Sequence, residues 1–419
     1  MINGYEFDFD LSQTRSIIKV IGVGGGGGNA VTNMFKRGIQ NVSFVVCNTD
    51  AQALENSIVP NKLQIGMDLT RGLGAGANPE VGKNAAIESK NEIESLLNDG
   101  TKMVFITAGM GGGTGTGAAP VIASIASKLE ILTVGIVTTP FSFEGTKKME
   151  QAQKGIKELK QYCDTVLIVL NDKLRKVLGN LSISNAFSQA DNVLTTAAKS
   201  IAEIITVPGY INVDFEDVKT VMKKSGTAVM GSAQTEGENR AQKAAEMALN
   251  SPLLNIRDIK GAKKILLSIV SGYDDELQMD ELSIITDYIR EQVGNDVEMI
   301  FGHSLDSQLK ESIRVTVVAT GFEDSEPIIE LNIDENISET EEKSSASNVK
   351  KKNKNQNTKK NIDNKQQLLF DDLEQDEYNN KYLKYKKVIN FDENFIAEYK
   401  NVPAYVRRNI TLIDLKQRN

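Results

Sequence analysis

Histidine and cysteine are scarce in this sequence of 419 residues. Because His303 is the only histidine, neither a metal site built on histidines nor a Ser-His-Asp triad fits the chain. The two cysteines, Cys47 and Cys163, do not form a Cys-x-x-Cys pair, which favours a reducing compartment over a disulfide framework. Chemistry in this protein must therefore rest on carboxylates, backbone amides and a bound cation.

Long apolar runs and an excess of positive charge are also lacking. No stretch of eighteen apolar residues occurs, and residues 1–15 lack the basic and then apolar pattern of a leader peptide. The net charge of -8 disfavours a nucleic-acid-binding protein, and the lysines at 350–352 and 359–360 lie in a polar stretch typical of a solvated linker. We therefore expect a soluble cytoplasmic protein that neither inserts into a membrane nor binds nucleic acid.

The order of strand-like and helix-like segments predicts an α/β protein with two folded parts. From residue 17 to about 170, strand-like runs at 17–23, 42–46, 103–108, 132–137 and 166–170 alternate with helix-like segments, which is typical of a doubly wound, Rossmann-like parallel sheet. A long helical periodicity over 185–205 predicts a bridging helix. A second, smaller mixed α/β domain is predicted by strand-like runs at 265–270, 297–301 and 313–319, with helix-like segments at 240–250 and 280–292.

Composition divides the chain further. After Gly321 the sequence becomes acidic and then basic, with Asn, Lys and Ser dominating, which predicts a disordered tail. We divide the chain into a flexible N-terminus (1–15), a nucleotide-binding domain (16–184), a bridging helix (185–207), a C-terminal α/β domain (208–322), a mostly disordered linker (323–400) and a terminal peptide (401–419).

Two glycine-rich loops are the most informative motifs. They span 22–29 and 111–117, and each follows a strand-like stretch and precedes a helix-like segment, expected to begin at Asn29 and at Thr114. Glycine lets backbone N–H groups approach phosphate oxygens, and a helix N-terminus adds positive potential. The first loop alone also fits the G-x-G-x-x-G pattern of an NAD-dependent oxidoreductase, but the second has no place in that fingerprint. Glycines that only make tight turns are the other reading, which the pair of loops disfavours.

The second loop, GGGTGTG, resembles the signature of the tubulin and FtsZ superfamily. Several further stretches between residues 16 and 321 resemble FtsZ in order and spacing, as does a short segment at 401–409. The resemblance implies a GTPase that binds GTP or GDP with Mg²⁺ and polymerises head-to-tail into the division ring, at mid-cell on the inner face of the membrane. A catalytically silent relative and the NAD-dependent oxidoreductase are the alternatives.

The resemblance also implies which residues bind the nucleotide. Two polar side chains, Asp191 and Asn171, would bind the guanine base, because a carboxylate accepts from both of the donors that guanine presents. Glu144 would hold the ribose, with a first-turn helix residue as the alternative, and Lys148 stands where the family commonly has arginine. The remaining contacts, mainly to the phosphates, would come from Gly25, Gly26, Gly27, Gly28, Asn29, Asn48, Ala75, Gly76, Gly112, Gly113, Thr114 and Gly115.

A group that activates water is missing from the glycine loops, and the best candidates lie far downstream. If a helix begins near Val213, Asp214 and Asp217 lie on one helical face, where two carboxylates could hold a hydrated cation and polarise a water molecule. The resemblance implies that Asn212, Asp214 and Asp217 act on the GTP of a neighbouring subunit, with no metal site within one subunit. Capping of a helix by Asn212, followed by an acidic first turn, is the structural alternative.

The end of the chain combines proline, an aromatic residue and paired arginines in residues 401–409. This mixture is typical of a short recognition segment that orders on binding, and a remnant of the tail is the alternative. The resemblance implies that Pro403, Tyr405, Arg407 and Arg408 dock membrane tethers such as the actin-like FtsA, and that other division proteins are partners too.

Overall fold

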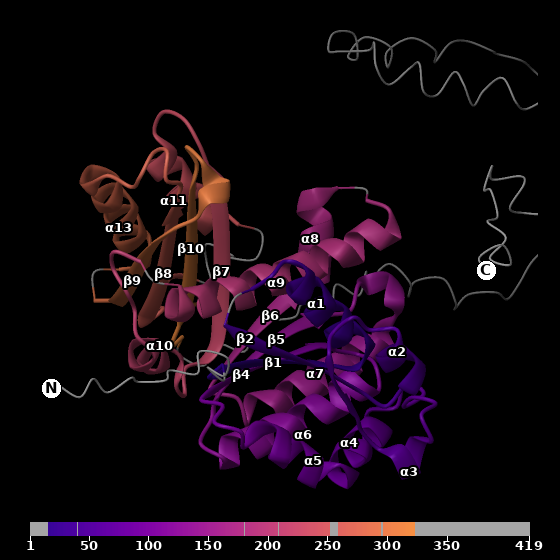
Figure 1. Cartoon of the computed structure of the whole chain (residues 1–419). Helices are drawn as coiled ribbons and strands as arrows, with labels where there is room; N and C mark the ends of the chain where they lie inside the picture. The colour runs from indigo at the N-terminus through magenta and orange to yellow at the C-terminus, as the bar shows by residue number, and fades with distance from the viewer. Residues whose placement is uncertain are drawn as a thin grey trace, which may run out of the picture. The chain divides into compact units, whose positions relative to one another are not determined.

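A computed structural model of the chain describes residues 16–322, apart from residues 40, 180, 208, 252–258 and 295 (Figure 1). The predictions made for 1–15, 323–400 and the terminal peptide 401–419 lie outside these residues. None of the helices in the described ranges is long and apolar enough to cross a membrane.

The first folded part is a parallel sheet, as predicted. Its strands follow the order β3-β2-β1-β4-β5-β6, and neighbouring strands pair in parallel. Their bounds are β1 Ile18–Val23, β2 Val42–Asn48, β3 Asn61–Gln64, β4 Met103–Gly109, β5 Leu132–Thr139 and β6 Thr165–Leu170. Only β3 was missed, because its sequence NKLQ is polar and lacks β-branched residues.

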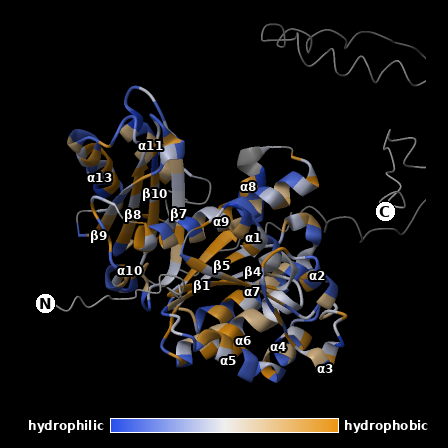
Figure 2. Cartoon of the chain, viewed as in Figure 1, coloured by the Kyte–Doolittle hydropathy of each residue, from blue (hydrophilic) through white to orange (hydrophobic). Residues whose placement is uncertain are grey.

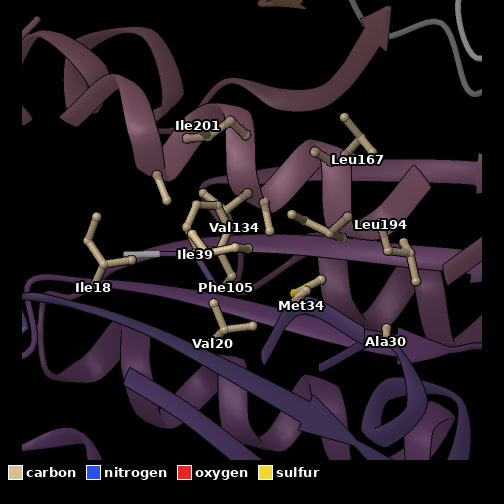
Figure 3. Packing of buried hydrophobic residues seen from close by; sticks show 14 of the residues in the cluster. Ile18, Val20, Ala30, Met34, Ile39, Phe105, Val134, Leu167, Leu194 and Ile201 are labelled. Carbon is tan, nitrogen blue, oxygen red and sulfur yellow. The ribbon is translucent and has the colours of Figure 1, made fainter. Parts of the chain in front are cut away.

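Helices cover both faces of this sheet. Alternate residues of β1 point to opposite faces, so that Ile18 and Val20 join one core cluster and Ile21 and Val23 join another. Helices α1 (Gly24–Lys36) and α9 (Ile183–Thr206) contribute to the first cluster (Figure 3), as does α10 (Phe215–Met222). Helices α4 (Pro79–Glu88), α5 (Lys90–Leu97), α6 (Thr114–Lys128) and α7 (Thr146–Lys160) contribute to the second. In Figure 2 the central strands are coloured apolar, whereas polar residues lie toward the outside of the helices.

The second folded part is a mixed sheet. Strands β7 (Gly226–Thr235), β10 (Ile313–Thr320), β8 (Lys264–Ser271) and β9 (Glu298–Leu305) lie in that order, with an antiparallel pair on each side of β10 and a parallel pair between β8 and β9. Helices α11 (Arg240–Leu249) and α13 (Met279–Val293) share a separate apolar core with it. The predicted strands and helices of this part are therefore confirmed, except that β7 was missed.

Strand β7 joins the two sheets into one of ten strands. Its first residues pair in parallel with β6, from Gly226 opposite Thr165 to Ala228 opposite Leu167. Its later residues pair with β10, where Val229 lies opposite Ala319. The hydrogen bonds of β7 therefore run without a break from one part to the other. The division of the chain into domains stays a prediction.

Helix α9 is the long helix that the periodicity predicted, and it begins at Ile183, two residues before the predicted start. Ser182 caps it by accepting a hydrogen bond from the N–H of Asn185 at 3.3 Å. Its buried face, which includes Leu194 and Ile201, packs on the strands of the first sheet (Figure 3). The side chains along α9 are therefore fixed relative to both ends of these strands.

Candidate active site

The two glycine loops meet at the carboxyl edge of the parallel sheet, after β1 and β4. Helix α1 begins at Gly24, not at Asn29 as expected, and Gly24 has a φ of +71°. A Cβ atom on Gly24 would lie 2.8 Å from the backbone nitrogen of Gly115, and one on Gly26 would lie 3.1 Å from the Cα of Gly109. Only glycine permits this approach, so that the N-termini of α1 and α6 lie together.

Open space borders some of these glycines. A Cβ atom added to Gly25, Gly28 or Gly112 would meet no atom within 4 Å. In contrast, Cβ atoms on Gly27 and Gly113 would lie 2.3 Å from the carbonyl oxygen of Thr107 and 2.9 Å from the side chain of Ala75, respectively. Two helix N-termini beside such a space suit a phosphate group.

The loops that follow β2 and α3 (Met67–Thr70) reach the same edge. The Oδ1 atom of Asn48 accepts a hydrogen bond from the N–H of Thr49 at 2.9 Å, and the Oγ1 atoms of Thr49 and Thr114 lie 2.7 Å apart. The N–H of Gly74 donates to the carbonyl oxygen of Thr49 at 3.3 Å. Asn48, the segment that continues to Ala75 and Gly76, and the second glycine loop are therefore linked by hydrogen bonds and packing.

Glu144 and Lys148 lie together beyond the end of β5. Glu144 belongs to the short 3-10 helix η2 (Ser142–Glu144), which precedes α7. Its Oε1 atom accepts from the N–H of Phe141 at 2.9 Å, and its Oε2 atom lies 3.0 Å from the Nζ atom of Lys148. Asp172, which sequence analysis did not single out, accepts a hydrogen bond from the N–H of Ser142 at 3.0 Å. These contacts hold the turn next to the end of β6.

The side chains of Asn171 and Asp191 present hydrogen-bond acceptors to which no described residue donates. Asn171 follows β6 directly and begins α8 (Asn171–Leu178). Its Oδ1 atom is buried and accepts no hydrogen bond from the described residues. Burial raises the pKa of the Asp191 carboxyl on α9 to about 6. A desolvated carboxylate and an unsatisfied amide oxygen are suited to a ligand that brings N–H donors.

An aromatic residue near Asp191 was missed by sequence analysis. Phe187 precedes Asp191 by one helical turn on α9, and its side chain is 40% exposed. Its ring meets Phe141 edge-on at a centroid distance of 5.2 Å, and Phe141 stacks on Phe143 at 5.1 Å. An exposed aromatic residue four positions before a helical carboxylate is the sequence signal that could have identified it.

The downstream carboxylates form a helix cap. Helix α10 begins at Phe215, two residues after Val213, near which its start was expected, and Asp214 is its N-cap. The Oδ1 atom of Asp214 accepts from the N–H of Asp217 at 2.9 Å, and the Oδ2 atom of Asp217 accepts from the N–H of Asp214 at 3.2 Å. Each carboxylate keeps its other oxygen outside this capping box. Asn212 does not cap the helix; its Oδ1 atom accepts from the N–H of Gly209 at 2.6 Å.

The loop that carries these carboxylates lies at the opposite edge of the sheet from the glycine loops. The carbonyl oxygen of Met222, at the end of α10, accepts a hydrogen bond from Thr165 at the start of β6, whereas Asn171 follows the end of β6. From Asp191 to the end of α9 at Thr206 there are 15 further residues, which extend about 22 Å. Figure 1 shows α9 running between the two regions. Among the described residues, no three or more His, Cys, Asp or Glu side chains are grouped to hold a metal ion.

The sequence matches two family models. Residues 17–179 match the model described as Tubulin/FtsZ family, GTPase domain, and residues 226–323 match the model described as FtsZ family, C-terminal domain. The chain belongs to the FtsZ family. FtsZ membership makes it a polymerising GTPase of cell division that binds guanine nucleotide, and the oxidoreductase alternative is not supported.

Relatives and solved structures agree with this assignment. The Cell division protein FtsZ of Wigglesworthia glossinidia brevipalpis is 51% identical over 318 residues, which cover 75% of this chain and 82% of that protein. The protein of the same name from Buchnera aphidicola subsp. Baizongia pistaciae is 46% identical over 399 residues, which cover 94% of this chain and 97% of that protein. A solved structure titled FtsZ dimer, empty (M. jannaschii) has a TM-score of 0.70 at 43% identity and covers 74% of this chain and 90% of that one.

A more distant structure shares the FtsZ fold. It is titled CetZ2 from Haloferax volcanii - GTPgS bound protofilament, and it has a TM-score of 0.63 at 23% identity. The match covers 74% of this chain and 94% of that chain. At this level of identity the likeness concerns the fold alone.

Proposed function

We propose that GTP bound by one subunit is hydrolysed when the loop 212–217 of the next subunit completes the site. One observation carries this proposal: the glycine loops and the Asp214–Asp217 capping box lie at opposite edges of the same sheet. A rigid subunit cannot bring its own Asp214 to its own phosphate loops. A head-to-tail contact brings one edge against the other, and because such a contact does not close on itself, it produces a filament.

The nucleotide-binding half of the proposed site, called here the nucleotide seat, lies at the carboxyl edge of the sheet, where the glycine loops meet. The phosphates lie over Gly25, Gly28 and Gly112, where the N-termini of α1 and α6 supply N–H donors and positive potential. The carboxylate of Asp191 accepts from both guanine donors, which replaces the solvation that it has lost. The same donors are absent from adenine in this arrangement, so that GTP is preferred over ATP. Phe187 offers its exposed ring to the base.

The hydrolytic step uses the loop 212–217, which lies at the opposite edge of the sheet. Mg²⁺ bound with GTP would supply positive charge against the negative charge that develops on the γ-phosphate. Asp214 orients the attacking water and accepts its proton through the oxygen that lies outside the capping box. Asp217 holds Asp214 in this orientation through the reciprocal hydrogen bond, and its own outer oxygen would be available to a hydrated cation. Asn212 fixes the preceding turn through Gly209.

The first test is a pair of matched variants. Asp214→Ala should retain GTP binding and filament formation and lower phosphate release by about 10²-fold, because a positioned acid-base group is lost. Glu216→Ala is the control, since Glu216 is exposed, its carboxylate pairs with Lys219 alone among the described residues, and it takes no part in the proposed step. Turnover of Asp214→Ala near that of the wild type would exclude the assigned role.

Mixing two inactive variants tests whether the site is shared. Asp191→Ala lacks the nucleotide seat but retains the loop, and Asp214→Ala lacks the loop carboxylate but retains the seat. In mixed filaments at equal ratio, about one quarter of the contacts would join an intact seat to an intact loop, and turnover should return to that level. If the mixture shows no recovery, and the turnover of the wild type is linear in protein concentration from zero, the whole site lies within one subunit. ATP in place of GTP is the control for base recognition.

We also propose that residues 401–409 dock a membrane tether such as FtsA, which would hold the filament at the mid-cell membrane. The support comes from the sequence, in which Pro403, Tyr405 and the paired Arg407 and Arg408 follow a long polar stretch. Removal of residues 401–419 should leave GTP turnover intact and abolish co-sedimentation with tether-bearing vesicles. Unchanged co-sedimentation would refute this role of the peptide.

A further inference from the structure

The only histidine of the chain contacts the loop that precedes α10. His303 lies on β9 and is 7% exposed. Its backbone N–H donates to the carbonyl oxygen of Ile211 at 3.1 Å. Its imidazole lies parallel to the ring of Tyr210, with a centroid distance of 6.2 Å and an interplanar angle of 11°. One residue of β9 therefore holds the loop through both its backbone and its side chain.

The loop has little room to shift along β9. A Cβ atom on Gly209 would lie 2.0 Å from the carbonyl oxygen of His303, so that the backbone of Gly209 rests directly on this strand. A Cβ atom on Gly302 would lie 3.1 Å from the Cγ2 atom of Val213, which is buried. The segment that ends at Asn212 and Asp214 is thus packed on Gly302 and His303. Tyr210, in contrast, is 73% exposed, and its ring lies parallel to the imidazole.

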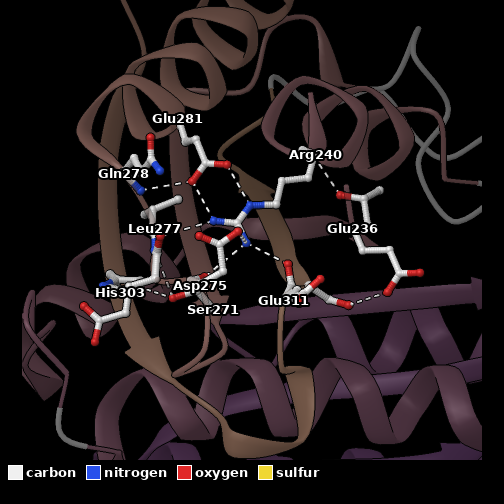
Figure 4. A network of polar contacts seen from close by, with 12 residues as sticks. Glu236, Arg240, Ser271, Asp275, Leu277, Gln278, Glu281, His303 and Glu311 are labelled. Carbon is white, nitrogen blue, oxygen red and sulfur yellow. Dashed lines mark hydrogen bonds and ion pairs between the residues drawn. The ribbon is translucent and has the colours of Figure 1, made fainter. Parts of the chain in front are cut away.

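The far side of the imidazole has a defined partner. The Oγ atom of Ser271, which is fully buried, lies 2.9 Å from the Nε2 atom of His303 and accepts a hydrogen bond from the N–H of Leu277 at 3.3 Å. Because a hydroxyl carries one donor and two acceptor sites, Oγ can bond Nε2 while it accepts from Leu277, and this contact fixes the plane of the imidazole. Figure 4 shows Ser271 next to His303 and Leu277.

We propose that His303 is a positioning residue for GTP hydrolysis: its neutral imidazole, held by Ser271, orients Tyr210 and thereby fixes the loop that carries Asn212 and Asp214. The inference rests on the proposed role of this loop. The titratable groups that face the imidazole are Tyr210 from the loop and Glu276 from the turn after β8. A second proton would place a positive charge on this buried imidazole, which is unfavourable, so that acid weakens the hold on the loop. Burial lowers the pKa of His303, which keeps the imidazole neutral at neutral pH.

The test compares Tyr210→Ala, its conservative counterpart Tyr210→Phe, His303→Gln and the double variant Tyr210→Ala/His303→Gln. We measure GTP turnover per sedimented subunit between about pH 5 and 8, together with KM. Tyr210→Ala and His303→Gln should each lower kcat about 5-fold without changing KM, as expected for a lost aromatic pair. Tyr210→Phe should restore the rate, and the double variant should be no slower than either single one. The fall in kcat at acid pH should disappear in His303→Gln.

The outcomes separate this inference from the proposed function. If Asp214→Ala, assayed alongside, retains turnover, the role of the loop is wrong. If Asp214→Ala is inactive while Tyr210→Ala and His303→Gln match the wild type in kcat and pH profile, the positioning role is wrong. Reduced sedimentation with unchanged kcat per sedimented subunit would also overturn it, because Tyr210 would then act in the contact between subunits. Ser271→Ala, expected to lower kcat by the same factor, replaces His303→Gln if that variant does not fold.

Discussion

Replacement of Asp191 by asparagine should stabilise the nucleotide-free protein near neutral pH and weaken its binding of guanine nucleotide. Burial raises the pKa of Asp191 from 3.8 to about 6, and no described residue compensates the charge. A shift of about two units corresponds to roughly 3 kcal/mol at full value. Because the side chain is only partly buried, solvent screening reduces the expected gain to about 1–2 kcal/mol of unfolding free energy.

The sign of the pH dependence follows from the direction of the shift. The folded-state pKa of Asp191 lies above the unfolded value, so that its contribution to stability is fully present below the unfolded pKa of 3.8 and is lost as the pH rises through about 6. The asparagine variant carries no such charge. Its advantage over the wild type should therefore be largest above about pH 7 and should disappear near about pH 4.

Nucleotide binding should change in the opposite direction. Asparagine keeps one acceptor but replaces the other carboxylate oxygen with a donor, which would face a guanine donor. Loss of one hydrogen bond to a charged group, at about 1.5–3 kcal/mol, weakens binding by about 10- to 100-fold. Titration with GDP and denaturant unfolding of the nucleotide-free protein measure the two effects separately.

A control lies on the same helix. Burial also raises the pKa of Glu203, whose carboxylate lies 3.5 Å from the Nζ atom of Lys199. Glu203→Gln should alter stability without altering affinity for GDP, because this residue follows Asp191 by three turns of α9. An Asp191→Asn protein that binds GDP as tightly as the wild type, or that is less stable at neutral pH, would contradict the reasoning.

Two further predictions concern the glycine loops and the second core. Gly28→Ala should lower GTP affinity by at least about 10-fold with no loss of unfolding free energy, because its Cβ enters the open space. Gly24→Ala should instead lower the unfolding free energy by about 1–3 kcal/mol, because of its positive φ and its contact with Gly115. Equal stability of the two variants would refute this contrast. Arg240 is buried and forms two hydrogen bonds with Glu281 (Figure 4). Its replacement by methionine should lower the unfolding free energy by about 3–5 kcal/mol and leave GDP affinity unchanged. An unchanged unfolding free energy would show that the pair is dispensable.

The sequence allowed prediction of the elements in which residue pattern and local structure agree. Strands such as β1, β4 and β5 are rich in apolar and β-branched residues, because both faces of the parallel sheet are buried. The helix α9 combines an apolar periodicity with a serine cap. Strand β7 has the sequence GTAVMGSAQT, whose small and polar residues give no strand pattern. It is a strand because β6 and β10 both supply hydrogen-bond partners.

The start of α1 and the role of Asp214 depended on contacts that no local pattern contains. A run of glycines is unfavourable in a helix, and here the close approach to Gly109 and Gly115 decides where α1 begins. Asn212 and Asp214 are both good capping residues, and only the geometry shows that Asp214 caps α10. The separation of Asp214 from Asp191 could not be predicted either, because it follows from the pairing of α10 with the start of β6.

The shared strand β7 has a practical consequence for dissecting the molecule. A fragment that stops before Gly226 would retain the glycine loops and α9 but would leave Thr165, Val166 and Leu167 of β6 at an uncovered sheet edge. This strand has the sequence TVLIVL, and an apolar edge of this kind recruits strands from other chains. Aggregation of such a fragment would therefore reflect a missing neighbour strand and would say nothing about filament assembly. Fragments meant to bind nucleotide on their own need a cut that keeps β7, or charged substitutions that protect the edge of β6.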